Sequence, residues 1–162
     1  MTVQYGNKRR VSATAVLGGR GALANVDDVA IMVTNVEKWT DADVIQLLEE
    51  SARLGGRITA PAAITHFFGE TLGGAASQRK MIVEWMKNND IEPTPRTLTI
   101  TESALMRAAL MAYSWLTKTE MKAFAPKDLT AAYIWVTRDL DTKPEDVKAA
   151  VEGCYKLLGK TV

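Results

Sequence analysis

The chain consists largely of short amphipathic segments. Most of them begin with a helix-capping residue and end at glycine or proline. The clearest covers residues 41–54, where Thr40 stands as the N-cap, Asp41 and Asp43 lie in the first turn, and Gly55 follows. A threonine at this position accepts a hydrogen bond from a free backbone N–H, and acidic residues in the first turn favour the helix dipole. This combination predicts a helix.

Seven further segments place apolar residues at helical spacing. In the last one, Thr142 and Glu145 form a capping box with Pro144 in the first turn. The first is rich in valine, whose β-branching also permits a strand. The predicted helices cover residues 26–36, 41–54, 59–72, 77–88, 99–117, 120–124, 126–140 and 144–158. We therefore expect an all-α fold: seven to eight helices in a compact, bundle-like domain with an extended N-terminal arm.

The domain organisation follows from charge and proline. Residues 1–25 are predicted to form a basic extended arm, with a possible short strand over residues 11–17. Residues 26–90 form an N-terminal helical lobe and residues 99–162 a C-terminal lobe. Between them, residues 91–98 contain two prolines and read as a linker. We expect the two lobes to share one core.

The apolar side of each predicted helix identifies candidate core residues. Cys154 lies at core spacing on the last helix and is expected to pack there, since one cysteine cannot form an intramolecular disulfide. The four tryptophans are expected in the core, or in part at subunit contacts. The predicted core comprises Leu47, Leu48, Phe67, Ile82, Trp85, Leu105, Leu116, Val136, Val151 and Leu158.

Residues suited to catalysis are scarce. The chain has one histidine, His66, which we expect at the surface or at an interface, and one cysteine, so the two cannot build a zinc site alone. The paired acids Asp27-Asp28 and Glu49-Glu50 lie at helix starts or on polar faces, where negative charge is solvated. The sequence favours a protein that is not an enzyme, with no catalytic residues, no metal and no cofactor.

Apolar runs in the chain are too short to span a membrane. The arginine-bearing, acid-free N-terminus imitates an organelle transit peptide and, more poorly, a signal peptide. We expect a protein that is cytoplasmic or part of a virion and is not secreted, with organelle import as a minor alternative.

The charge distribution supplies the functional hypothesis. The first 26 residues carry a net charge of +4 and the rest −3. A basic arm on a neutral body with no catalytic set favours a self-assembling viral coat or nucleocapsid protein, in which the arm contacts nucleic acid or a neighbouring subunit. Binding to phosphates would be independent of sequence and sensitive to salt. The candidate contacts are Lys8, Arg9, Arg10 and Arg20 in the arm, with Arg79 and Lys80 in the body.

Two alternatives remain open. Residues 59–88 could form a helix-turn-helix, with Gln78, Arg79 and Lys80 at the start of a recognition helix that binds DNA. The chain could instead be a helical adaptor or effector module, in which the small residues Ala108, Ala109 and Ala112 offer a docking groove. Sequence alone does not decide between these hypotheses.

Overall fold

The computed structural model describes residues 9–55, 60–116 and 119–162, with only the backbone of Arg9 and Gly55, and this part of the chain has an α/β fold. Five α-helices surround a six-stranded mixed sheet, so the all-α prediction is wrong. Three predicted helices are strands in the structure: residues 29–34, 62–67 and 120–124.

The strands lie side by side in their sequence order. β1, β2 and β3 are antiparallel, and β4, β5 and β6 continue from β3 in parallel. Strands that are covered on both faces lose the alternation of apolar and polar residues, which explains why residues 29–34 and 62–67 resemble helices in the sequence. Residues 120–124 form an edge strand, and five residues are too few to distinguish the period of a strand from that of a helix. The strands are β1 (Arg9–Val16), β2 (Gly21–Asp27), β3 (Val29–Thr34), β4 (Ala62–Phe67), β5 (Arg96–Thr101) and β6 (Glu120–Phe124).

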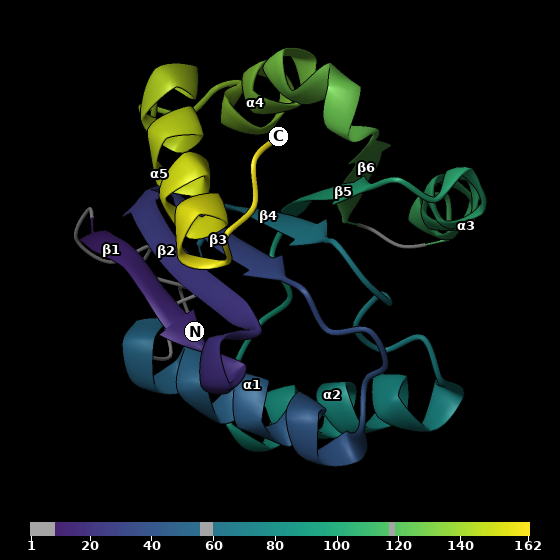
Figure 1. The fold of residues 1–162 in the computed structure, drawn as a ribbon. Helices are drawn as coiled ribbons and strands as arrows, with labels where there is room; N and C mark the ends of the chain where they lie inside the picture. Colours follow the sequence, from purple (N-terminus) through teal and green to yellow (C-terminus); the bar gives the residue numbers. More distant parts are fainter. Residues whose placement is uncertain (1–8, 56–59, 117–118) are drawn as a thin grey trace.

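Helices cover both faces of the sheet (Figure 1). α1 (Asp41–Gly55) and α2 (Ala76–Asn88) lie below it in this view, and α4 (Leu129–Thr137) and α5 (Pro144–Leu157) lie above it. α5 packs across β1, β2 and β3, whereas α4 packs on β4 and β5. The remaining helix, α3 (Ala104–Ser114), lies to the side against β6 and β5.

Segments predicted as arm, lobes and linker all contribute to this one sheet. Residues 9–25 form β1 and most of β2, joined by the short 3₁₀ helix η1 (Leu17–Gly19). Arg96 and Leu98, placed in the linker by the sequence, belong to β5. The basic N-terminal segment, as far as the structure describes it, is thus built into the domain.

The core has one apolar cluster on each side of the sheet. Of the predicted core residues, Leu47, Phe67, Val136 and Val151 are buried, and so is Cys154. Four others are half-buried: Leu48, Ile82, Trp85 and Leu158. Leu105 and Leu116 are 82% and 85% exposed, so their assignment to the core is wrong.

The caps predicted at Thr40 and Thr142 have different outcomes. Thr40 is confirmed: its Oγ1 accepts a bond from the Asp43 N–H at 3.1 Å, and the Asp43 carboxylate accepts one from the Thr40 N–H at 3.1 Å. At α5 the N-cap is Lys143, which makes no side-chain cap. Thr142 instead accepts a bond from the Asp28 N–H at 3.2 Å, and so ties the start of α5 to the turn between β2 and β3. Thr59, at the start of the helix predicted over residues 59–72, lies outside the described residues.

Candidate interaction surface

The basic residues proposed to bind nucleic acid are spread over the fold. Lys8 lies outside the described residues, and only the backbone of Arg9, at the start of β1, is described. Arg10 contacts the carboxylates of Asp27 at 3.3 Å and Asp146 at 3.5 Å. The hydrogen bond and charge of Asp27 raise the pKa of the Arg10 guanidinium. Arg10 thus has acidic partners within the protein.

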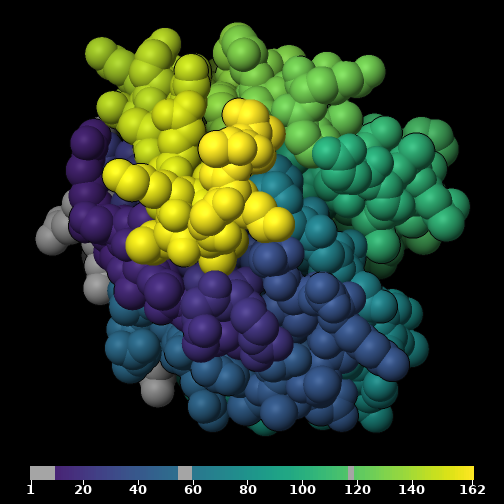
Figure 2. All heavy atoms as spheres, viewed as in Figure 1, coloured from purple at the N-terminus to yellow at the C-terminus, as the bar shows by residue number. Residues whose placement is uncertain are grey.

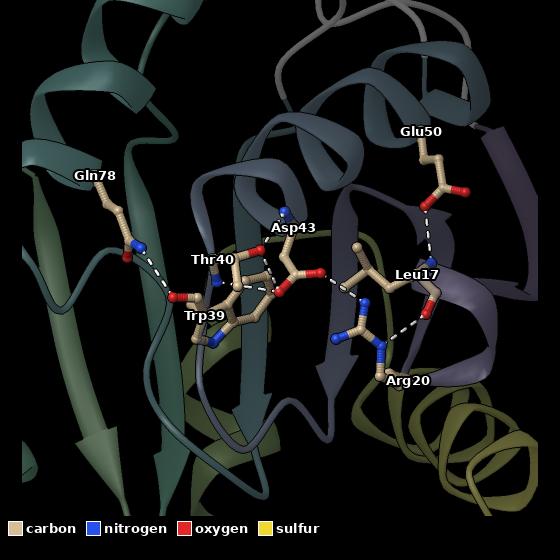
Figure 3. Close-up of polar contacts among 7 residues, drawn as sticks. All are labelled: Leu17, Arg20, Trp39, Thr40, Asp43, Glu50 and Gln78. Atoms are coloured by element: carbon tan, nitrogen blue, oxygen red, sulfur yellow. Dashed lines mark hydrogen bonds and ion pairs between the residues drawn. The ribbon is translucent and has the colours of Figure 1, made fainter.

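Arg20 lies at the other end of the hairpin, where it fixes the β1–β2 turn to α1 (Figure 3). Its Nη2 donates to Asp43 Oδ1 at 2.6 Å and its Nε to the Leu17 carbonyl at 3.2 Å. The bond from Arg20 is the main reason that the pKa of Asp43 falls to about 2. Glu50 accepts a bond from the Leu17 N–H at 2.9 Å, which adds a second link between the turn and α1. Arg20 therefore has a structural role.

Arg79 and Lys80 lie on α2. The Arg79 guanidinium donates to the carbonyls of Gly73 and Gly74 at 3.2 and 2.9 Å and so holds the turn before its own helix. Lys80 is exposed and forms a loose pair with Glu84 at 3.9 Å. Arg79 and Lys80 thus lie on a different element from Arg10, which belongs to β1.

The structure contradicts the helix-turn-helix predicted for residues 59–88. Its second half is α2, but Ala62–Phe67 forms the central strand β4, paired with β3 and β5. A recognition helix needs a supporting helix before it that crosses the DNA backbone. Here the supporting element is a buried strand.

His66 is fully buried in β4, and its prediction as a surface or interface residue is wrong. Its Nδ1 lies 2.6 Å from the Tyr155 hydroxyl, which is in turn hydrogen-bonded to Tyr133, and its ring stacks on Phe68 at 4.2 Å. Within the described residues, Nε2 is buried without a hydrogen-bond partner. Burial lowers the His66 pKa to about 4, so the ring is neutral at pH 7.

The remaining candidates for chemistry are equally enclosed. Cys154 is buried, and burial raises its pKa to about 12, which removes the thiolate needed for nucleophilic attack. In the described part of the chain, no three His, Cys, Asp or Glu side chains group so as to hold a metal ion. The same part has no helix long and apolar enough to cross a bilayer.

The most unusual surface belongs to α3, none of whose residues is buried. Leu105 near its start and Trp115 and Leu116 just after its end are more than 80% exposed, and Tyr113 is 55% exposed. Figure 2 shows the helix as a shoulder at the right side of the molecule. Large exposed apolar side chains that gather on one helix are typical of sites of protein–protein contact. We refer to residues 104–116 as the α3 surface.

Small residues and a lack of free charge complete the α3 surface. Ala108, Ala109 and Ala112 are exposed between the larger apolar side chains. Arg107 is the one charged residue of the helix, and its Nη1 donates to the carbonyls of Thr101 at 2.8 Å and Glu102 at 3.0 Å. The exposed alanines allow another backbone to approach closely, as the sequence suggested for Ala108, Ala109 and Ala112.

No known family is matched by this chain. Comparisons with protein-family models, with curated proteins and with solved structures each found no match. The α3 surface remains an apolar face that the described part of the chain does not cover.

Sequence reasoning placed Leu105 and Leu116 on an apolar face but assigned that face to the core. The composition of α3 led to this assignment, because the helix is apolar around most of its circumference, which is typical of a fully buried helix. A helix at the edge of a sheet cannot be covered on all sides by its own chain. The sequence does not show that α3 lies beside β6, at the edge of the sheet; this follows from the three-dimensional structure.

Proposed function

We propose that this protein is a non-enzymatic, self-associating module in which the α3 surface packs against the same surface of a second copy. One observation carries the proposal: α3 has no buried residue although it is strongly apolar. Leaving Leu105, Trp115 and Leu116 in water is unfavourable, because each gains roughly 1.5–3 kcal/mol when fully buried. Association removes these side chains from solvent.

A second copy suits the α3 surface better than a charged partner does. A two-fold interface places each surface against itself, so an exposed charge near the axis would meet the same charge. Arg107 is held by backbone carbonyls, and the other residues of α3 are uncharged. An apolar face without free charge is therefore complementary to itself, and α3 itself offers a charged partner no unpaired charge.

The geometry also suits helix-to-helix contact. Ala108 and Ala112 are four residues apart and so lie on one side of the helix. Two antiparallel copies of α3 would bring these alanines together at the centre, with Leu105 of each copy near Trp115 of the other. The eleven residues of α3 span about 16 Å, and Trp115 and Leu116 extend the surface beyond the helix.

The test is the oligomeric state of the full-length chain and of Ala108→Glu. Light scattering over a range of concentrations should show a dimer or larger assembly for the wild type. Glu at position 108 places two carboxylates face to face and should weaken association at least tenfold, which corresponds to roughly 1.4 kcal/mol. Because Ala108 is exposed, circular dichroism of the dilute variant should remain that of the folded wild type.

Ala131→Glu is the matched control, since Ala131 is an exposed alanine on another helix, α4. It should associate like the wild type. A wild-type protein that remains monomeric at about 1 mM, the limit of very weak affinity, would contradict the proposal. Equal loss of association in both variants would show that a different surface is used.

Nucleic-acid binding is not included in this proposal. Arg10 and Arg20 already contact carboxylates, and Arg79 contacts carbonyls. Binding to phosphates would require the arginines to give up these contacts, and each lost contact makes the free energy of binding less favourable. The prediction from sequence is checked by titration with single-stranded RNA of random sequence at several salt concentrations, where a steep loss of affinity with salt would support it.

A further inference from the structure

We propose that a small, uncharged and mainly apolar molecule binds in a cavity between the sheet and α1. The cavity has a volume of about 250 Å³ and lies between α1 and strands β1–β4, on the face of the sheet opposite α4 and α5. It is independent of the α3 surface, with which it shares no residue. Its wall includes Leu23, Asn25, Met32, Leu54, Ala63 and Thr65.

The strand register explains why a hollow exists here. Asn25 pairs with Ala30, and Ala30 pairs with Ala63, so one row across three strands carries only short side chains. The neighbouring residues Ile31 and Ile64 belong to the cluster on the other side of the sheet, so this row faces α1. Two alanines side by side leave room that leucine or isoleucine would fill.

α1 forms the opposite wall without closing the gap. Ser51 and Leu54, in the last turns of the helix, line the cavity. The first half of α1 is held elsewhere: Val44 and Leu47 are buried with the β1–β2 turn, and Asp43 binds Arg20. This anchoring keeps the helix in place over a row of residues too short to reach it.

The lining defines the chemistry of the ligand. None of the described residues that line the cavity carries a charge, so within this part of the chain a carboxylate or an ammonium group would lose its hydration without gaining a partner. Ser51 and Thr65 supply hydroxyl groups that, within the described residues, have no hydrogen-bond partner. The ligand should therefore be neutral and mostly apolar, with one group that donates or accepts a hydrogen bond.

The volume limits the ligand to one or two rings or a short branched chain. An engineered apolar cavity of roughly 150 Å³ is enough to bind benzene, whereas pockets for drug-sized molecules begin at roughly 300 Å³. The cavity lies between these limits. Indole, which has two rings, no charge and one N–H donor, is a suitable probe.

The experiment is a titration of the full-length protein with indole, followed by ¹H–¹⁵N and methyl NMR. We expect saturable shifts at Ser51, Leu54 and Met32. Ala63→Leu should fill the cavity, weaken indole binding at least tenfold and raise the melting temperature. Ala131→Leu, an exposed control on α4, should leave binding unchanged.

Two further measurements keep the test decisive if Ala63→Leu folds poorly. Thr65→Val removes one hydroxyl at nearly constant volume and should weaken indole binding about threefold to tenfold, yet leave benzene binding unchanged. Indole-3-acetate, which adds a carboxylate, should bind at least tenfold more weakly than indole. The proposal is overturned if indole causes no saturable shifts, if Thr65→Val affects benzene and indole equally, or if the charged analogue binds as tightly as the neutral probe.

Discussion

The buried His66 makes stability depend on pH in a defined window. In the unfolded chain the imidazole has its ordinary pKa of 6.5, and burial lowers this to about 4 in the folded protein. The unfolded state therefore binds one more proton between these values, so stability is complete above pH 6.5 and is lost as the pH falls toward 4. At roughly 1.36 kcal/mol per pH unit, the total loss is about 3 kcal/mol.

The assay is urea unfolding of the wild type and of His66→Phe at half-unit steps from pH 7.5 to 4. The phenylalanine cannot titrate, and Tyr155 keeps its hydrogen bond to Tyr133. Carboxylates titrate in both proteins, so the difference between the two pH profiles isolates His66. We expect the wild type to lose about 1.4 kcal/mol more per pH unit below pH 6 than the variant.

Because the chain has a single histidine, NMR gives an independent readout. The Hε1 resonance of the folded protein should not shift between pH 7.5 and 5. A folded-state titration centred near pH 6.5, or parallel stability profiles for wild type and variant, would refute the reasoning.

Three substitutions check other contacts. Thr142→Ala should cost about 1 kcal/mol because it leaves the partly buried Asp28 N–H without its partner, whereas Thr142→Ser should retain most of the stability; chemical denaturation distinguishes them. Thr40→Ala removes the cap of α1 and should cost about 1 kcal/mol by the same measurement, and no change would show that the helix starts elsewhere. Gly69→Ala would place a Cβ 2.2 Å from the Val36 carbonyl oxygen, so the melting temperature should fall by several degrees, corresponding to about 1–3 kcal/mol.

The helices were more accessible from the sequence than the strands. Residues 41–54 and 77–88 were predicted almost to the ends of α1 and α2, because both segments carry apolar residues at helical spacing, and Thr40 caps the start of α1. Residues 59–72 were misread because Ile64, Phe67 and Phe68 also fit a helical period. β4 lies at the centre of the sheet and is covered on both faces, so its six residues carry no alternation that marks a strand.

The candidate sites depend on contacts between residues that lie far apart in the sequence, and the sequence alone does not reveal these contacts. His66 was assigned to the surface because its partner Tyr155 is 89 residues away. Similarly, the charge of Arg20 suggested a free arm, while its partner Asp43 was assigned to a helix dipole. Local pattern identifies the residue types, but only the pairing of β1, β2 and α1 shows that these charges neutralise one another.

The position of α5 has a consequence for synthesis on the ribosome. Each strand adds beside the one made just before it, so the sheet can grow from β1 to β6 while the chain is still emerging. The upper side of β1–β3, however, is covered by the last helix of the chain. A nascent chain that ends before Pro144 therefore leaves this apolar face of its first three strands exposed to solvent. The strands made first are the last to be covered on this side, because α5 is synthesised after all six strands.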